Sequence, residues 1–467
     1  MSMTKTIQNR IDWIPDVKDS GLPLYLTIAD AIAKDKANGR LSPGDRLPPQ
    51  RHLARNLNVD FTTVARAYVE AQNRGLVSSI VGRGTFIAMP EARPAPANYA
   101  EMIDFSMNLP PEPDDPALIA RMERGFAGIG QDLIDLLRYQ SFGGSPEAKH
   151  AASIWLQRRG LLPAHEQLFI TAGAHAALCS IFGILAKPGD IILAEAITYP
   201  GARSIAAQFG AKLAAVRMDE QGIDPDALAE ACERLRPKAL YLNPTLQNPT
   251  TITVPETRRQ AITDVARRFR LPIIEDDAYC FIPAHAPAPF ATLAPELTWY
   301  IAGLSKCLGA GLRCAYVVAP DARSAWPFIA SSRAATVMAS PLTVALTTRW
   351  VEDGTGEAII HAIRKETMAR QEMANKILAA HAFSSDPLSF NLWLPLPAPW
   401  TRSAFIGQMQ YKAIGIVPSD AFVVEGFAPE AVRVCLGGPT KRQEIQSALE
   451  FMAHILSESP ALASNYL

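Results

Sequence analysis

The chain has 467 residues, of which 48% are hydrophobic and 19% are charged, and its formal net charge is −1. This length exceeds what one hydrophobic core usually supports and predicts two or three domains, while the composition excludes a disordered or fibrous protein. The near-neutral average hides an asymmetry, because 11 Lys and Arg stand against 7 Asp and Glu between Lys18 and Arg93, whereas acidic residues exceed basic ones elsewhere. A locally basic N-terminal segment is typical of a small nucleic-acid-binding domain joined to a larger body.

The cysteines and the apolar runs of the sequence indicate the cellular compartment of the protein. Six cysteines are scattered without a CxxC pair or a histidine at metal-ligand spacing, so we expect reduced thiols in a cytoplasmic protein and no metal site. The first residues lack the apolar core of a signal peptide, and no run of about 18 apolar residues predicts a membrane-spanning helix.

The first elements in chain order are three helices. From Pro23, apolar residues recur every fourth position until Asn38-Gly39, which predicts an amphipathic helix that ends at a glycine. A short helix over residues 50–57 and a tight turn follow. The third helix then starts with Asp60 as N-cap, buries Val64, Tyr68 and Ala71, and leaves polar residues free near its start.

This arrangement matches the helix-turn-helix, in which the start of the second helix of the pair enters the major groove of DNA. Residues 76–89 contain strand-like residues around Gly82-Arg83-Gly84 and predict a two-stranded wing with a basic tip. A three-helix bundle with a hairpin but no DNA-binding role would show the same local pattern.

The run from PLYLTIADAI through GDRLPPQRHLAR and TTVARAYVEAQNRGLV to GRGTFIA resembles the GntR-type winged helix-turn-helix over almost its full length. The resemblance implies a DNA-binding domain over residues 18–88. It also implies that the DNA-facing residues are Arg51, Thr62, Thr63, Arg66 and Arg83. Gln50 departs from the family, which more often has an acidic residue there.

Residues 89–101 are proline-rich and predict a semi-extended linker. Beyond it, short β-branched and aromatic runs alternate with helical stretches, which predicts an α/β sheet with ligands bound at the strand ends. The predicted strands are LFITAG, DIILAE, KALYLNP, PIIEDDAY, TWYIAGLSK and AYVVAP.

Several strand ends bear chemically suggestive residues. Lys306 follows TWYIA and could form a Schiff base with an aldehyde, although a loop lysine is more often simply solvated. Asp276 closes PIIED and could hold a pyridine nitrogen protonated, or merely cap a turn. Asn248 could donate to a ring hydroxyl. The small residues of TAGAH at a helix start favour a phosphate.

In this order, with a strand before each, these segments resemble a fold-type I pyridoxal-phosphate aminotransferase over residues 102–467. The resemblance implies a large lobe over about residues 145–345 and a small lobe built from the flanking segments. It implies that Lys306 holds pyridoxal 5'-phosphate as a Schiff base and that Asp276 pairs with the pyridine nitrogen. The other cofactor-binding residues implied by the resemblance are Asn248 and Tyr279 at the phenolic oxygen, Tyr199 on the ring, and Gly173, Ala174, His175 and Arg313 at the phosphate.

Two more residues match the aminotransferase pattern. Arg433 occupies the position that binds a substrate α-carboxylate, a task that suits a planar guanidinium, although an arginine on a surface strand is the alternative. Tyr139 matches the tyrosine that a partner subunit contributes to the phosphate. Gly303 departs from the family, which often has Ser or Thr there, and a proline expected near Ile197 is absent.

The whole chain resembles the MocR subfamily of GntR-type bacterial regulators. This implies a head-to-tail homodimer that binds a double-stranded DNA operator and responds to the cofactor and to a small amine or amino acid. The competing hypothesis is a catalytically active aminotransferase with an accessory DNA-binding domain, and residual turnover is compatible with the residues present. A third hypothesis keeps the fold as a dimerisation scaffold without cofactor.

Overall fold

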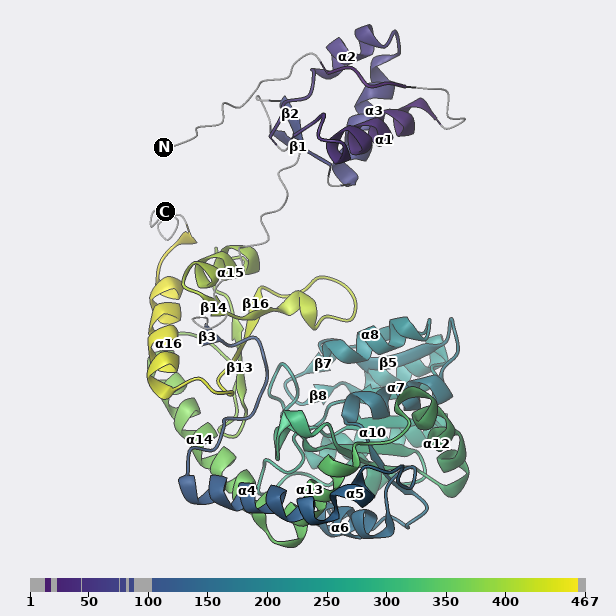
Figure 1. The fold of residues 1–467 in the computed structure, drawn as a ribbon, viewed down its shortest axis with the longest axis vertical. Coiled ribbons are helices and arrows are strands. Elements are labelled where there is room, and N and C mark those ends of the chain that lie inside the picture. The colour runs from purple at the N-terminus through teal and green to yellow at the C-terminus, as the bar shows by residue number, and fades with distance from the viewer. Residues whose placement is uncertain are drawn as a thin grey trace. The chain divides into compact units, whose positions relative to one another are not determined.

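The computed structural model describes residues 13–17, 23–42, 44–74, 76–80, 84–87 and 103–460. The chain divides into two compact units, residues 1–100 and 101–467, which we call the N-terminal unit and the aminotransferase-like unit (Figure 1). Within the described part of the chain, every helix is too short or too polar to cross a membrane.

The N-terminal unit packs three helices around one core. The helices are α1 (Leu24–Ala37), α2 (Gln50–Asn56) and α3 (Phe61–Asn73). The predicted N-cap is present, since the carboxylate of Asp60 accepts a hydrogen bond of 2.8 Å from the backbone N–H of Thr62. The predicted core face of α3 is confirmed, because Val64, Tyr68 and Ala71 are buried.

Two antiparallel strands complete this unit. They are β1 (Val77–Ile80) and β2 (Gly84–Ile87), and Val77 pairs with Ile87. The predicted hairpin is therefore present at its base. Arg83 and the rest of the predicted tip lie outside the described residues.

A seven-stranded sheet forms the centre of the aminotransferase-like unit, in the order β4-β12-β11-β10-β9-β5-β6. The strands are β4 (Leu168–Thr171), β5 (Ile191–Glu195), β6 (Lys212–Val216), β9 (Ala239–Leu242), β10 (Ile273–Asp276), β11 (Thr298–Gly303) and β12 (Ala315–Val318). Six of them are the strands expected from the sequence. β12 runs antiparallel to both neighbours, and the pairs among β11, β10, β9, β5 and β6 are parallel.

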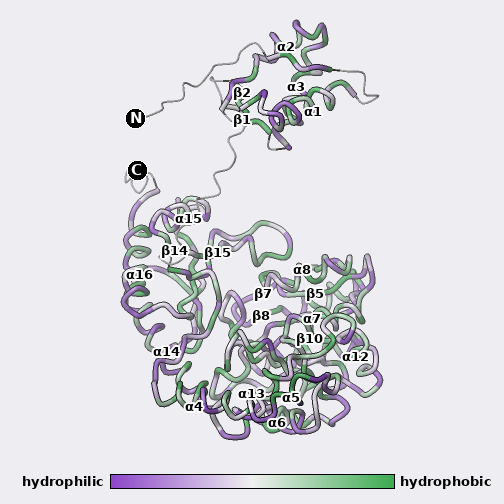
Figure 2. Tube along the Cα trace, viewed as in Figure 1, coloured by the Kyte–Doolittle hydropathy of each residue, from purple (hydrophilic) through white to green (hydrophobic). Residues whose placement is uncertain are grey.

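Helices cover both faces of this sheet, so successive side chains of a strand enter different cores. On β11, Trp299 and Ile301 pack with α7, α8 and α12, whereas Tyr300 and Ala302 pack with α6 and α13. In Figure 2, hydrophobic and hydrophilic stretches alternate along these covering helices. The helices of this lobe are α4 (Pro116–Ile129), α5 (Leu133–Leu136), α6 (Pro146–Gln157), α7 (Ala174–Leu185), α8 (Pro200–Gln208), α9 (Pro225–Leu235), α10 (Glu256–Phe269), α11 (Phe290–Leu293), α12 (Ala322–Thr336) and α13 (Pro341–Glu352).

A smaller lobe lies beside the large one and is reached through the long helix α14 (Thr355–Ile377) (Figure 1). It contains a three-stranded sheet in the order β13-β16-β15, and β3 pairs with β14. Its elements are β3 (Ile103–Asp104), β13 (Asn391–Pro395), β14 (Ile414–Gly415), β15 (Val417–Pro418), β16 (Ala431–Cys435), α15 (Arg402–Tyr411) and α16 (Arg442–Ser457). The large lobe also contains a short hairpin, in which β7 (Met218–Asp219) pairs with β8 (Gly222–Ile223).

Candidate functional site

A cavity of about 400 Å³ lies in the aminotransferase-like unit, where the ends of β10 and β11 meet the small lobe. It brings together nine of the residues proposed from the sequence, namely Ala174, His175, Tyr199, Asn248, Asp276, Tyr279, Lys306, Arg313 and Arg433. These residues come from segments up to 259 positions apart in sequence, from Ala174 to Arg433. The fold therefore gathers the predicted residues into one place.

Lys306 ends a single 3-10 turn, Leu304–Lys306, directly after β11. Its Nζ donates a hydrogen bond to the main-chain carbonyl of Asn108. Burial disfavours the ammonium form and lowers the pKa of Lys306 to about 8, and the nearby Arg433 acts in the same direction. A lysine with a lowered pKa offers more neutral amine at neutral pH than an exposed lysine does.

Asp276 is the last residue of β10 and is buried. Tyr241 donates a hydrogen bond of 2.9 Å to its Oδ2, and Asn243 donates one of 2.5 Å to its main-chain carbonyl. Its Oδ1 is buried and has no hydrogen-bond partner among the described residues. Burial raises the pKa of this carboxyl to about 6. One oxygen is thus fixed while the other is free for a donor.

Arg433 lies on β16 and is only 6% exposed. Its Nη1 donates a hydrogen bond of 2.8 Å to Oδ1 of Asn248, and its Nη2 donates to the main-chain carbonyl of Ser106. The guanidinium stacks 4.9 Å from the ring centroid of Phe422. Since Oδ1 of Asn248 is used by the arginine, its Nδ2 is the group left to donate to a ligand.

The start of α7 forms the cationic end of the cavity. Gly173 precedes the helix with a φ of +91°, a conformation that suits glycine, and a Cβ there would lie 3.3 Å from Arg313. Free backbone N–H groups and the helix dipole favour an anion at such a start. Burial and the charge of Arg313 lower the pKa of His175, which favours its neutral form.

Two tyrosines enclose the cavity. The hydroxyl of Tyr279 accepts a hydrogen bond of 2.7 Å from Nδ2 of Asn108, and its ring is buried. Tyr199 precedes α8 and lines the cavity beside Pro200. Tyr199 therefore lies in the cavity although the proline expected near Ile197 is absent.

Several cavity residues had not been expected from the sequence. Asn108 lies between Lys306 and Tyr279 but belongs to no motif that could have signalled it, and Tyr241 reads as an ordinary strand residue. Ser305 also lines the cavity and was detectable, since it directly precedes the lysine. At Gly303, an added Cβ would lie 3.4 Å from that of Ala174, an ordinary van der Waals distance, so crowding does not explain the glycine at this position.

Tyr139 lies away from the cavity, whereas Gly173 directly precedes the lining residue Ala174 without lining the cavity itself. The side chain of Tyr139 is 82% exposed and does not line the cavity within this chain. It follows α5 on the surface of the large lobe.

In the N-terminal unit, the proposed DNA-facing residues cluster around the starts of α2 and α3. The guanidinium of Arg66 lies 4.4 Å from the ring centroid of Tyr25, and that of Arg51 lies 5.9 Å from the ring of Phe61. The hydroxyl of Thr62 donates to Asp60. Arg51, Thr62 and Arg66 are exposed and Thr63 is half-buried, so all four side chains reach the surface.

Comparison with known families agrees with this division. The model for aminotransferase class I and II matches residues 100–451. The chain belongs to this family. The family depends on pyridoxal 5'-phosphate. A second model, for bacterial regulatory proteins of the gntR family, matches residues 24–87 and implies DNA binding by the N-terminal unit.

Similar proteins include transcriptional regulators and an aminotransferase. YdeF of Bacillus subtilis, named as an uncharacterized HTH-type transcriptional regulator, is 28% identical over 96% of this chain and 97% of its own length. PtsJ of Salmonella typhimurium, named as a vitamin B6 salvage pathway transcriptional repressor, is 27% identical over 81% of this chain and 86% of its own length. Among solved structures, LysN, an α-aminoadipate aminotransferase from Thermus thermophilus, superposes with a TM-score of 0.70 at 22% identity, covering 79% of this chain and 94% of that chain.

These comparisons confirm the predicted fold class and the architecture of the MocR subfamily, a GntR-type winged helix-turn-helix fused to an aminotransferase class I and II domain. They favour a regulator over an enzyme with an accessory domain, because YdeF and PtsJ, which cover most of this chain, are named as transcriptional regulators. The limits of the predicted linker and lobes stay predictions.

Proposed function

We propose that this chain is a transcriptional regulator in which pyridoxal 5'-phosphate, together with an amine or amino-acid effector in the aminotransferase-like unit, sets how the N-terminal unit binds a DNA operator. The supporting observation is the presence in one chain of a gntR-family domain and a buried cavity that holds Lys306, Asp276 and Arg433. An enzyme alone has no need of the first, and a simple DNA-binding protein has no need of the second.

The carboxylate of Asp276 fits the ring nitrogen of the cofactor. Its Oδ1 is buried without a partner in the described part of the chain, and a buried acceptor without a donor is costly. A protonated pyridine nitrogen is the donor that such an oxygen would accept from. Asp276 would thus hold a proton at that nitrogen through a charge-assisted hydrogen bond.

The opposite end of the cavity fits a phosphate. Gly173, Ala174 and His175 place the N-terminus of α7 there, and Arg313 adds a formal positive charge. With the cofactor anchored at both ends, Tyr279 and the free amide of Asn248 would donate to its phenolic oxygen. Tyr199 would lie against its ring.

When bound, pyridoxal 5'-phosphate supplies an aldehyde that condenses with primary amines. Lys306 is the amine this chain offers, and its lowered pKa of about 8 makes the neutral, nucleophilic form accessible near neutral pH. Lys306 is therefore the residue that we propose to hold the cofactor.

Arg433 supports an effector that bears a carboxylate. Its two terminal nitrogens are both directed at oxygen atoms, Oδ1 of Asn248 and the carbonyl of Ser106, and a carboxylate could replace these neutral acceptors with a bidentate pair. An amino acid would then present its amine toward Lys306 and its carboxylate toward Arg433.

In the N-terminal unit, we propose that Arg51, Thr62, Thr63 and Arg66 face DNA, together with Arg83 of the wing. The support is their position around the starts of α2 and α3 and the exposure of the two described arginines. A DNA-bound regulator of this bacterial family would act in the cytoplasm.

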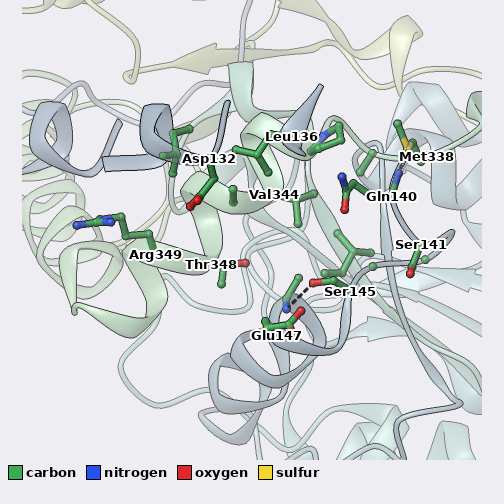
Figure 3. Close-up of a pocket in the computed structure, with 18 of the residues that line it drawn as sticks. Asp132, Leu136, Gln140, Ser141, Ser145, Glu147, Met338, Val344, Thr348 and Arg349 are labelled. Atoms are coloured by element: carbon green, nitrogen blue, oxygen red, sulfur yellow. Dashed lines mark hydrogen bonds between the residues drawn. The ribbon is translucent and has the colours of Figure 1, made fainter. Parts of the chain in front are cut away.

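The homodimer is proposed from the surface around Tyr139. Leu133, Ile134 and Leu137 are 43%, 68% and 66% exposed, and Tyr139 follows them at 82%. Beside them lies a hollow of about 380 Å³, in which Figure 3 shows Leu136 and Val344 near Gln140 and Met338. Exposed apolar side chains gathered in this way mark an interaction surface. A second copy, arranged head to tail, would cover them and bring Tyr139 to the partner's phosphate site.

Selection of DNA tests the proposal. Full-length protein would be incubated with a pool of random DNA duplexes, with and without pyridoxal 5'-phosphate, and bound duplexes would be sequenced. We expect enrichment of a two-part motif, as a dimer requires. Absence of any enriched motif under both conditions would contradict a regulator, and steady keto-acid production insensitive to deletion of residues 1–90 would favour the enzyme.

A further inference from the structure

Two cations of the cavity bind the same short piece of main chain. Lys306 donates to the carbonyl of Asn108, and Arg433 donates to the carbonyl of Ser106. These are the residues that the proposed function assigns to the cofactor aldehyde and to the effector carboxylate. Main-chain carbonyls within residues 106–108 therefore accept hydrogen bonds from the side chains of both Lys306 and Arg433.

The side chain of Asn108 strengthens this connection. Its Nδ2 donates hydrogen bonds to the hydroxyl of Tyr279 at 2.7 Å and to Oδ1 of Asn391 at 3.1 Å. Asn391 in turn donates one of 2.8 Å to the carbonyl of Pro249, next to Asn248. Asn108 is only 7% exposed, and its Oδ1 has no partner among the residues the structure describes. Asn108 thus contacts Lys306 and Tyr279 directly and reaches Pro249, the chain neighbour of Asn248, through Asn391.

The place of Asn108 in the chain gives these contacts a consequence. It follows β3 by four residues, and β3 is the first described element after the predicted linker of residues 89–101. The backbone N–H of Cys435 donates to the carbonyl of Phe105, which ties the segment to β16, the strand of Arg433. Residues 105–109 are therefore the piece of the aminotransferase-like unit that joins the cavity to the linker most directly along the chain.

We infer that Asn108 is a positioning residue that holds residues 105–109 against Lys306 and Tyr279, and that engagement of Lys306 by the cofactor aldehyde loosens this segment. The inference rests on the proposed function. A lysine nitrogen that has condensed with an aldehyde, with loss of water, no longer has the three N–H donors of an ammonium. Tyr279 can donate its hydroxyl hydrogen to the phenolic oxygen and still accept the hydrogen bond from Asn108. The contact that the segment loses is therefore the hydrogen bond from Lys306 to the carbonyl of Asn108.

Hydrogen exchange on the full-length protein tests this directly, because the segment contains two reporter amides. The N–H of Ser106 donates to Asp104 at 2.8 Å, and that of Leu109 donates to the carbonyl of Met107 at 2.9 Å. Both amides are hydrogen-bonded inside the segment, so we expect them to exchange faster when it opens. We expect pyridoxal 5'-phosphate to speed their exchange by about fivefold or more, the lower end of a typical coupling between two sites.

Pyridoxamine 5'-phosphate is the matched ligand, because it has the same ring and phosphate but no aldehyde. It should leave the exchange of these two amides close to that of the empty protein. Equal effects of the two ligands would overturn the role given to Lys306. Visible absorbance would monitor cofactor binding in the same samples.

The Asn108→Ala variant should exchange fast with and without cofactor, so that the difference seen in wild type is lost. If Asn108→Ala folds poorly, Asn108→Asp replaces it in the test, because an ionised aspartate has nearly the same size as asparagine but no side-chain donor. Asn108→Asp should show the same loss of the difference. Met107→Leu is the neighbouring control and should respond like wild type. Cofactor binding with unchanged exchange in wild type would overturn this inference alone, whereas absence of cofactor binding would overturn the proposed function and this inference with it.

Discussion

The hydroxyl of Tyr241 donates to one carboxylate oxygen of Asp276 at 2.9 Å and leaves the other oxygen, Oδ1, without a partner in the described part of the chain. Tyr241 lies on β9 and Asp276 ends the neighbouring β10, so the sheet itself fixes the direction of the carboxylate. The carboxylate of Asp276 is thus held at Oδ2 by Tyr241, and its buried Oδ1 can accept a hydrogen bond from one further donor.

The first prediction concerns that free oxygen. Asp276→Asn removes the negative charge, so the variant should bind pyridoxal 5'-phosphate more weakly by about 1.5–3 kcal/mol, roughly tenfold to a hundredfold. Tyr241→Phe should have a smaller effect, because the carboxylate remains. Titration of cofactor absorbance measures both. Equal affinities of Asp276→Asn and wild type would show that Asp276 does not hold the ring nitrogen.

The same carboxylate gives a pH dependence. Burial raises the pKa of Asp276 to about 6, so this carboxylate becomes protonated as the pH falls through that value. A neutral acid cannot balance a protonated ring nitrogen. Wild-type affinity for the cofactor should therefore fall below about pH 6, measured by equilibrium dialysis, and this fall should be reduced in Asp276→Asn.

The second prediction concerns Glu195, at the end of β5. Burial raises the pKa of this carboxyl from 4.5 to about 8, against the hydrogen bonds from Thr198 and Asn243. Since the folded protein holds the proton more tightly than the unfolded chain, this contribution to stability is complete below the unfolded pKa and is lost as the pH rises through about 8. Above about pH 6, where Asp276 has already ionised, the buried Glu275, whose pKa burial raises to about 7, contributes to the same loss, so the effect of Glu195 is the difference between wild type and a variant that lacks this carboxyl.

We expect Glu195→Gln to remove this loss. Between about pH 6 and pH 8, the free energy of unfolding of wild type should fall more steeply than that of Glu195→Gln, by about 1.4 kcal/mol per pH unit. Urea denaturation at several pH values measures this slope. Glu230→Gln, on the exposed face of α9, should follow wild type, and parallel curves for Glu195→Gln and wild type would refute the prediction.

The third prediction separates DNA contact from fold stability. If Arg51 neutralises one phosphate, Arg51→Ala should lower the slope of log affinity against log salt by about one, for any duplex. Arg74 is the control, because its guanidinium is already paired with Asp30 at 2.5 Å and with Glu70 at 2.7 Å. Fluorescence anisotropy over a range of salt measures the slope. An unchanged slope for Arg51→Ala would remove this residue from the interface.

The fourth prediction tests the dimer. Ile134→Asp places a charge in the middle of the exposed apolar surface and should convert a dimer into a monomer, measured by light scattering after gel filtration. Leu162→Asp, at another exposed leucine (75%), should keep the mass of wild type. A monomeric wild-type protein at micromolar concentration would contradict the proposed sharing of Tyr139.

Much of the cavity could be predicted from the sequence because its residues stand at strand ends with recognisable neighbours. Asp276 closes a buried strand, and Lys306 follows another, so their order along the chain already resembled the aminotransferase pattern. The strands themselves were predictable because both faces are buried, which makes them continuous apolar runs.

The residues that were missed act through contacts between distant segments. Asn108 reaches Tyr279 across 171 positions and Asn391 across 283, and no local spacing encodes such a pairing. Tyr241 looks like a core aromatic, and only the neighbouring register of β9 and β10 shows that its hydroxyl meets Asp276. Tyr139 shows the opposite case, since a family pattern suggested a role that one chain alone does not display.

The central claim, that the cofactor site sets DNA binding, is tested most directly by comparing wild type with Lys306→Ala on one duplex chosen by selection. Affinity would be measured by fluorescence anisotropy without ligand, with pyridoxal 5'-phosphate, and with the cofactor plus a panel of amino acids. A coupling of about 1–3 kcal/mol predicts that the affinity of wild type changes by about fivefold or more, whereas that of Lys306→Ala does not respond. Identical affinities of the two proteins under every condition would contradict the account.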